Sequence, residues 1–184
     1  MGSCYLPEWS ARLGESAQVS WIELEQTVAS EVLLAALETS DKLRQLGVPH
    51  ALVGGLAVGH HGHPRATKDA DFIVGDQAFA KTSPLLVYRD ELASVVRVGT
   101  VDLLATTNDP SLQGSLVIPQ AGIVPIAPIS VLVLMKLRAS RPQDLADVAL
   151  LIKTGMDMHQ VLGFLSQHAP EHVATFTELT RRAL

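Results

Sequence analysis

Three aspartates in the middle of the chain have the type and spacing to hold a divalent metal ion. Asp69 and Asp71 lie two residues apart in "DADFIVG" (69–75), and Asp102 is the single charge in "TVDLLAT" (100–106). Residues i and i+2 of a strand point to the same face, so the first two carboxylates are expected together. Their repulsion is offset by a hard cation with oxygen ligands, Mg²⁺ or Mn²⁺. The spacing predicts a metal site, although solvated aspartates at strand ends would give the same pattern.

A glycine pair upstream of these aspartates is typical of a turn that approaches a phosphate. Gly54 and Gly55 follow the apolar segment "HALV" (50–53) and precede "LAVGHHG" (56–62). The pattern predicts a buried strand, a sharp turn and one or two helical turns. Glycines let the backbone come close to a phosphate, with N–H groups of the helix start directed at it. A tight turn without any ligand would also need glycines. The glycine pair therefore indicates a phosphate site only in combination with the aspartates that follow it.

The first element that must position these residues is a long amphipathic helix. Apolar residues recur at helical spacing over 20–46. Ser20 and Glu23 form a capping box, and Gly47 followed by Pro49 predicts the end of the helix. The sequence therefore predicts one continuous helix before the first strand.

Short strands and then helices follow. Strands are predicted at 50–53, 69–75 and 100–106, with 92–99 as a further strand or the first half of an interrupted one. Residues 106–128 contain four prolines and form a loop region, in which "SLVI" (115–118) adds an edge strand. From Ser130 the pattern is helical to the end, with Pro142 in a first turn and Gly155 as a C-cap. The predicted fold class is α+β, a small mixed β-sheet packed with helices and followed by a helical C-terminal tail.

A chain of 184 residues with 47% hydrophobic residues can bury one good core. We expect an N-terminal extension (1–19), a core of helix and mixed sheet (20–128), and a helical C-terminal region (129–184) packed on the same core. The net charge of −5 argues against a broad basic face for nucleic acid. The single cysteine, Cys4, fits a reducing compartment, and apolar runs such as 129–135 are too short to span a membrane. These features predict a cytoplasmic protein without a membrane partner.

The motifs, taken in order, resemble a known superfamily. "VGGLAV" (53–58), "HPRATKDADFIV" (63–74) and "TVDLLAT" (100–106) are similar to the signature of nucleotidyltransferases of the DNA polymerase beta superfamily. That signature is a Gly-Gly or Gly-Ser turn, then Asp-x-Asp, then a third acidic residue on a later strand. The form Arg-x-Thr-x-Asp-x-Asp and the later "LVLMKLRASRPQDLADVALL" (132–151) resemble the AbiEii/AbiGii toxin-like branch. The resemblance covers residues 30–155.

The resemblance implies a role for each matching residue. Gly54 and Gly55 would cradle the triphosphate of an NTP, and Asp69 and Asp71 would ligate Mg²⁺. Asp102 would be the third metal ligand and would help to deprotonate the attacking hydroxyl. Lys136 would contact triphosphate oxygens. Arg65 and Thr67 would hydrogen-bond phosphate or fix the start of the strand that carries Asp69 and Asp71. Asp144 and Asp147 share a helix face and would position Lys136 or contact the nucleotide, unless they only favour the helix dipole.

The leading hypothesis is a Mg²⁺-dependent nucleotidyltransferase that moves a nucleoside monophosphate from an NTP to a hydroxyl of RNA, such as the tRNA 3′ end, or of a protein. This hypothesis is compatible with a toxin that is paired with a cognate antitoxin. It is also compatible with a homodimer. The alternatives are a weakly active or inactive binding or regulatory protein with the same fold, and a small-molecule transferase of the antibiotic-modifying kind. An acidic cleft would favour cationic small molecules, whereas a basic rim at Lys136, Arg138 and Arg141 would favour RNA.

Three clustered histidines have no assigned role. His60, His61 and His63 are too close in sequence for one zinc ion to take all three without an unusual backbone, and no cysteine supports such a site. We expect surface or loop histidines near the nucleotide pocket.

Overall fold

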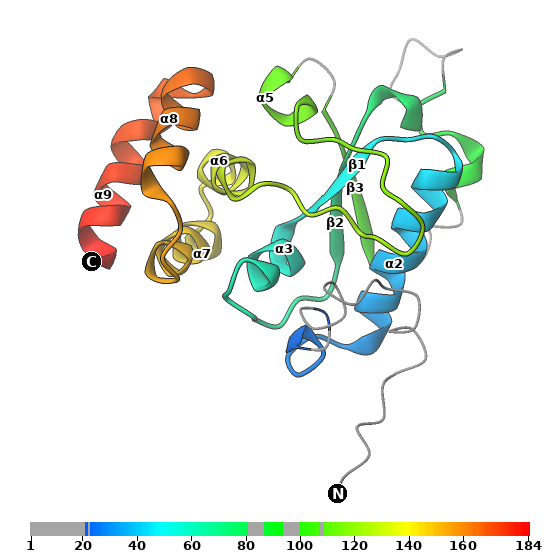
Figure 1. The fold of residues 1–184 in the computed structure, drawn as a ribbon, viewed down its shortest axis with the longest axis horizontal. Coiled ribbons are helices and arrows are strands. Elements are labelled where there is room, and N and C mark those ends of the chain that lie inside the picture. Colours follow the sequence, from blue (N-terminus) through cyan, green and yellow to red (C-terminus); the bar gives the residue numbers. More distant parts are fainter. Residues whose placement is uncertain (1–20, 22, 81–86, 94–99, 107–108) are drawn as a thin grey trace, which may run out of the picture.

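A three-stranded mixed sheet forms the centre of the fold (Figure 1). The computed structural model describes residues 21, 23–80, 87–93, 100–106 and 109–184. The strands are β1 (His50–Val53), β2 (Ala70–Val74) and β3 (Val101–Ala105), in the order β1-β2-β3. The first pair is antiparallel and the second pair is parallel. The predicted small mixed sheet is therefore confirmed.

Helices cover both faces of this sheet, which gives an α+β fold. Figure 1 shows α2 on one side of the strands and the C-terminal helices gathered on the other. The α-helices are α2 (Ser30–Gln45), α3 (Gly54–His60), α5 (Pro110–Gln113), α6 (Ile129–Ala139), α7 (Pro142–Lys153), α8 (Met158–His168) and α9 (Val173–Ala183). Single 3₁₀ turns are η2 (Asp76–Ala78), η3 (Asp90–Leu92) and η4 (Pro170–His172).

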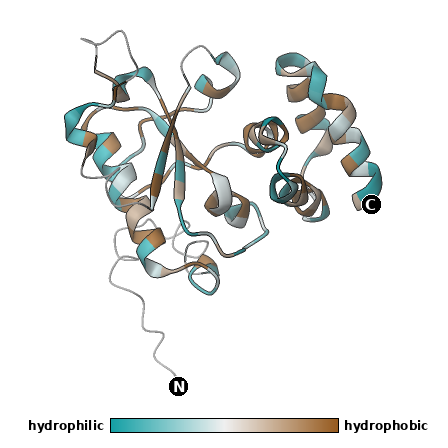
Figure 2. Cartoon of the chain, turned by 180° about the vertical axis from the view of Figure 1, so that it is seen from behind, coloured by the Kyte–Doolittle hydropathy of each residue, from teal (hydrophilic) through white to brown (hydrophobic). Residues whose placement is uncertain are grey.

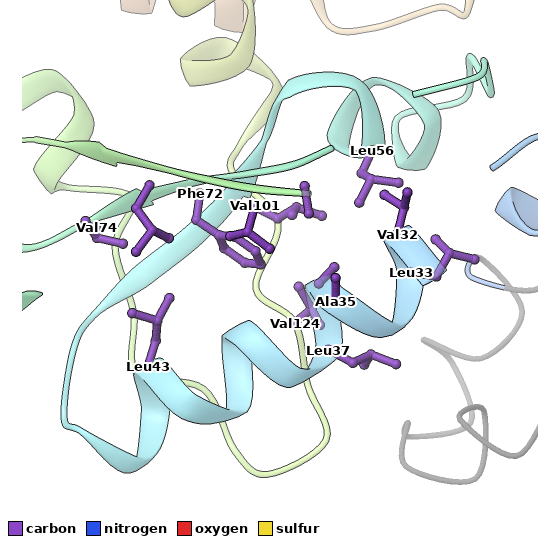
Figure 3. Packing of buried hydrophobic residues seen from close by; sticks show 14 of the residues in the cluster. Val32, Leu33, Ala35, Leu37, Leu43, Leu56, Phe72, Val74, Val101 and Val124 are labelled. Atoms are coloured by element: carbon purple, nitrogen blue, oxygen red, sulfur yellow. The ribbon is translucent and has the colours of Figure 1, made fainter. Parts of the chain in front are cut away.

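The alternation of side chains along the strands divides the core between the two faces. Phe72 and Val74 of β2 pack against α2, and Figure 3 shows Ala35 and Leu43 of that helix directed toward them. Ile73, between them, faces the opposite way and joins a second cluster with helices α6 to α9. This is the period-two pattern expected of a strand that is buried on both faces.

The second cluster joins the sheet to the C-terminal helices. Val53 of β1 packs with apolar residues of α3, α6, α7 and α8, and Phe176 of α9 completes the cluster. Figure 2 shows mostly apolar strands, whereas α2 and the C-terminal helix alternate apolar and polar residues. Such alternation is typical of helices with one face on the core and one in water.

The single helix predicted over 20–46 is wrong, because the segment contains two helical pieces. Trp21 and Leu24 belong to a short helical piece, a turn follows, and α2 begins at Ser30 after an extended Ala29. Leu24 and Val28 are 2% and 3% exposed and pack on the same core as α2. Both pieces bury their apolar residues in one cluster, so the helical spacing continues through the break. The predicted cap at Ser20 and the extension 1–19 with Cys4 lie outside the described residues.

The predicted edge strand at 115–118 is reduced to a single bridge. Val117 forms an antiparallel bridge with His50, and Ile126 forms a parallel bridge with Leu52. The proline-rich segment thus lines the outer edge of β1 without becoming a regular strand, because proline lacks the N–H that a ladder needs. Most of the strand predicted over 92–99 lies outside the described residues, and Leu92 belongs to the 3₁₀ turn η3.

Helix ends in the C-terminal region follow the predicted signals. Pro142 occupies the first turn of α7, and Gly155, just beyond its end, has a φ of +84°. This left-handed conformation is one that glycine adopts without a steric cost. Across the part of the chain that the structure describes, no helix combines the length and apolar character needed to cross a bilayer.

Candidate functional site

The parallel register of β2 and β3 brings the three aspartates together. Asp71 and Asp102 are directly paired across these strands, and Asp69 precedes β2 by one residue. One carboxylate oxygen from each of the three lies within 4.8 Å of the others. Asp69 and Asp71 are half-buried and Asp102 is exposed, so the cluster is accessible from one side. Three carboxylates supply the hard oxygen donors that Mg²⁺ prefers, and the donor set therefore fits that ion.

Asp71 is the electrostatically strained member of the cluster. Burial, followed by the negative charges of Asp69 and Asp102, raises its pKa to about 6, against smaller opposing effects of Lys136 and Arg141. The cause is that both desolvation and like charges disfavour the ionised carboxylate. A divalent cation between the carboxylates would remove this repulsion.

The raised pKa of Asp71 predicts an effect on stability. An unfolded aspartate titrates near pH 4, so between about pH 4 and 6 the folded state binds more protons than the unfolded state. The contribution of Asp71 to stability therefore falls as pH rises through this window. We expect metal-free Asp71→Asn to gain on the order of 1–2 kcal/mol in free energy of unfolding at about pH 7.5, and a few degrees in melting temperature.

Thermal unfolding in EDTA at several pH values measures this effect. The advantage of Asp71→Asn over the wild type should shrink as the pH falls from about 6 to about 4, and excess MgCl₂ should raise the melting temperature of the wild type alone. Asp90→Asn is the control, because Asp90 is exposed and lies outside the cavity. A metal-free Asp71→Asn protein that melts below the wild type at about pH 7.5 would contradict the prediction.

The glycine turn packs directly against the acidic cluster. Gly54 has a φ of +65°, and a Cβ atom at this position would lie 1.7 Å from Oδ2 of Asp71. A Cβ atom at Gly55 would lie 2.6 Å from Oγ1 of Thr67. Gly54 is therefore required both by its backbone conformation and by the space that Asp71 occupies, whereas Gly55 is required by the space that Thr67 occupies.

Replacing Gly54 with alanine tests this packing, with Gly47 as a matched control. Gly47 has a φ of +68°, yet nothing lies within 4 Å of a Cβ atom there. Both alanine variants should lose about 1–2 kcal/mol of stability from the left-handed conformation. Only Gly54→Ala should also lose the Mg²⁺-dependent rise in melting temperature, because its methyl group displaces the Asp71 carboxylate. An equal Mg²⁺ response in both variants would show that Asp71 does not need this space.

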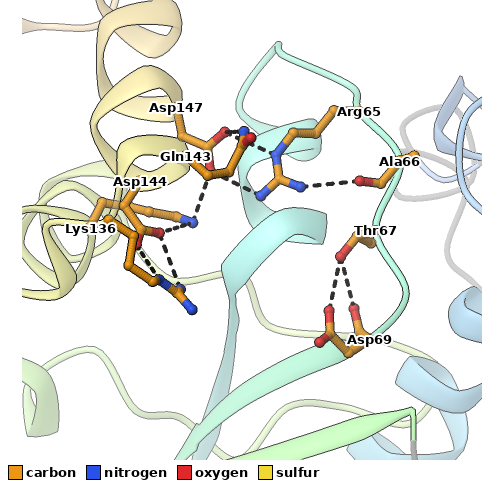
Figure 4. A network of polar contacts seen from close by, with 9 residues as sticks. Arg65, Ala66, Thr67, Asp69, Lys136, Gln143, Asp144 and Asp147 are labelled. Carbon is orange, nitrogen blue, oxygen red and sulfur yellow. Dashed lines mark hydrogen bonds and ion pairs between the residues drawn. The ribbon is translucent and has the colours of Figure 1, made fainter.

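The loop before β2 is held by Thr67 and Arg65. The Thr67 hydroxyl donates to Oδ1 of Asp69 at 3.0 Å, which orients that carboxylate. Arg65 donates from Nε and Nη2 to the two carboxylate oxygens of Asp147, both at 2.9 Å. Figure 4 shows Arg65 reaching from this loop to α7. The pair therefore ties the loop that enters the acidic strand to the C-terminal helices.

Lys136 lies in the same ion-pair network. Its Nζ contacts Oδ1 of Asp144 at 2.8 Å and Oδ2 of Asp147 at 2.9 Å (Figure 4). Arg141 donates from Nε to Asp144 at 2.6 Å, and Gln143 donates to Asp147 at 2.9 Å. Burial acts to raise the pKa of both aspartates, but these hydrogen bonds and charges outweigh it and hold both pKa values below their ordinary range.

One cavity of about 440 Å³ unites these residues. All eight residues singled out from the sequence line it: Gly54, Gly55, Arg65, Thr67, Asp69, Asp71, Asp102 and Lys136. Arg141 and Asp144, also noted in the sequence, lie on its wall. Sequence reasoning missed Leu104, Met135 and Gln143, because apolar and amide side chains in regular elements carry no signal of their own. A cavity of about 530 Å³ between α2 and residues 120–124 contains none of the predicted site residues.

The histidine cluster does not belong to this cavity. His60 ends α3 and is exposed, whereas Nε2 of His61 hydrogen-bonds the carbonyl oxygen of Ala127 at 2.9 Å. Neither these residues nor His63 lines the cavity. Within the described ranges, the aspartate trio is the one group whose geometry could hold a metal ion.

Comparison with known proteins leaves the site to be judged on its geometry. No protein-family model matches the chain, and a search of curated proteins gives no match.

Proposed function

We propose that this chain is a Mg²⁺-dependent nucleotidyltransferase. It moves a nucleoside monophosphate from an NTP to a hydroxyl acceptor, with release of pyrophosphate. The observation that carries the proposal is the presence of three clustered carboxylates, a glycine turn and a lysine in one cavity. Nucleotidyl transfer needs these groups, because the protein mainly positions the reactants and compensates charge.

Each group has a distinct task in this reaction. Asp69, Asp71 and Asp102 would hold the metal, with Thr67 orienting Asp69. When bound, Mg²⁺ offsets negative charge on the phosphate and on the attacking and leaving oxygens. The turn at Gly54 presents no side chain, so phosphate oxygens can approach its backbone closely.

The cations of the cavity would contact the donor from the opposite wall. Lys136 has three N–H donors and uses two of them on Asp144 and Asp147, which leaves one for a phosphate oxygen. The Arg141 side chain is 75% exposed at the cavity and keeps donors beyond those bound to Asp144. Asp144 and Asp147 would act as positioning residues for these cations.

The resemblance to the AbiEii/AbiGii toxin-like branch supports a nucleotidyltransferase-like fold. It also suggests what the enzyme does in the cell. A small mixed sheet with helices on both faces is compatible with that fold. On this resemblance we include a toxin role with a cognate antitoxin in the proposal. The single cysteine and the short apolar runs support including a cytoplasmic location. A catalytically inactive protein that binds a partner through the same fold is the competing function.

Transfer of label from each α-³²P NTP tests the proposal. The purified chain is incubated with Mg²⁺ and, separately, with total cellular RNA, protein extract and hydroxylated small molecules. Label that enters one acceptor, requires Mg²⁺ and is lost in Asp71→Asn would establish the enzyme. No transfer to any acceptor, together with no Mg²⁺-dependent NTP binding, would overturn the proposal and favour the binding protein.

A further inference from the structure

One side of the cavity, formed by Leu104 of β3 with Met135 and Ala139 of α6, is apolar. Leu104 follows Asp102 by two residues on β3, so both side chains point to the same face of the sheet. Leu104 is 42% exposed, and it lines the cavity together with Met135 and Ala139 of α6. An exposed apolar surface beside a polar reaction centre is typical of a binding surface.

The strand order places this apolar flank where an acceptor must enter. The glycine turn follows β1, and β3 lies on the far side of β2 from β1. In-line transfer requires the attacking oxygen and the leaving pyrophosphate to lie on opposite sides of the α-phosphate. If the phosphates lie toward Gly54 and Lys136, the attacking hydroxyl approaches over β3, past Asp102 and Leu104.

The charges that line the cavity within the described ranges do not suit an acceptor with a phosphodiester backbone. Among the residues that the structure describes, the three cations that line the cavity are Arg65, Lys136 and Arg141, and each already contacts a buried aspartate. Arg138, which does not line the cavity, is paired with Asp109. Binding of RNA depends on lysines and arginines that neutralise phosphates, and under the proposed function the donors left on these side chains would bind the triphosphate of the NTP.

From these observations, and resting on the proposed function, we propose that the acceptor is the hydroxyl of a tyrosine presented by another protein. A tyrosine combines an apolar ring, which packs on Leu104 and contacts the Met135 side chain, with a hydroxyl at its tip that reaches the α-phosphate. The phenolic oxygen forms a bond to the α-phosphorus, and the bond from that phosphorus to the oxygen bridging to the β-phosphate breaks. Pyrophosphate leaves, and the phenolic proton is released to water.

The test compares two defined acceptors with the intact chain. A neutral peptide with one tyrosine and a single-stranded RNA with a free 3′ hydroxyl are each incubated with Mg²⁺ and the α-labelled NTPs. We expect label in the peptide, lost when its tyrosine is replaced by phenylalanine, and no label in the RNA. Label in the RNA alone would overturn the tyrosine proposal while leaving the nucleotidyltransferase intact. No label in either acceptor or in cell extracts, with no Mg²⁺-dependent NTP binding, would overturn both.

Substitutions at Leu104 identify the surface that binds the acceptor. Leu104→Ser should raise the KM for the tyrosine peptide by about tenfold and change the Kd for Mg²⁺-NTP by less than about twofold, because the side chain contacts only the acceptor. Leu104→Met should restore the KM. Val117→Ser removes an equally exposed apolar side chain outside the cavity and should have no effect. An unchanged KM in Leu104→Ser would overturn the assigned role of Leu104.

Discussion

Asp71→Asn is expected to lower the rate of nucleotidyl transfer by on the order of 10³-fold or more. Asp71 is the central carboxylate of the site, paired with Asp102 across the sheet and packed beneath the glycine turn. Asparagine has nearly the same shape but removes the charge that holds a metal ion and thus the means of offsetting charge in the transition state. Single-turnover transfer of labelled NMP at saturating NTP measures the loss.

Two comparisons separate this loss from misfolding. Asp90→Asn removes an exposed aspartate outside the cavity and should retain wild-type activity. Asp71→Asn should also be at least as stable as the metal-free wild type at neutral pH, because it removes a carboxylate whose pKa is raised to about 6. An Asp71→Asn protein that keeps more than about a tenth of wild-type activity would exclude Asp71 as an essential metal ligand.

Asp147→Ala is expected to cost about 3–5 kcal/mol in free energy of unfolding. Asp147 is fully buried and accepts hydrogen bonds from Arg65, Lys136 and Gln143. Its removal leaves the buried Lys136 with Asp144 as its remaining partner and breaks the link between the loop before β2 and α7. A chain of this length should then melt about 6–20 °C lower.

Asp41→Ala is the matched control for burial. Asp41 also accepts hydrogen bonds from an arginine and a glutamine, Arg44 and Gln45, but its side chain is 43% exposed. Exposed ion pairs contribute about 0–1 kcal/mol, so Asp41→Ala should be nearly neutral. Urea unfolding of both variants measures the difference. Equal costs in the two variants would mean that the buried network contributes no more than a surface pair.

Asp147→Ala is also expected to weaken Mg²⁺ binding, because the ion-pair network holds the loop before β2. The Arg65–Asp147 pair anchors the loop that carries Thr67, which in turn orients Asp69. Any folded fraction of the variant should therefore bind Mg²⁺ more weakly. Lys136→Met combined with Asp147→Leu would test whether packing can replace charge, because apolar residues often substitute well for a buried ion pair.

Local features of this protein could be predicted from the sequence because their causes act within a few residues. The i, i+2 spacing of Asp69 and Asp71 determines that they share a face, and the period of apolar residues identifies the strands and the C-terminal helices. Gly155 and Pro142 mark helix ends because of their own backbone preferences. The composition of the cavity was also predictable in part, since a metal or phosphate site needs charged residues and glycines.

Only the tertiary structure decided which distant residues meet. The parallel register that pairs Asp71 with Asp102, and the contact of Arg65 with Asp147 across 82 residues, depend on how the connections close and which faces are buried. The break before α2 is equally invisible to periodicity, because both pieces pack on one core. Leu104 became exposed beside the cavity for the same reason: local sequence sets the face of a strand on which a side chain lies, whereas tertiary packing decides what covers that face.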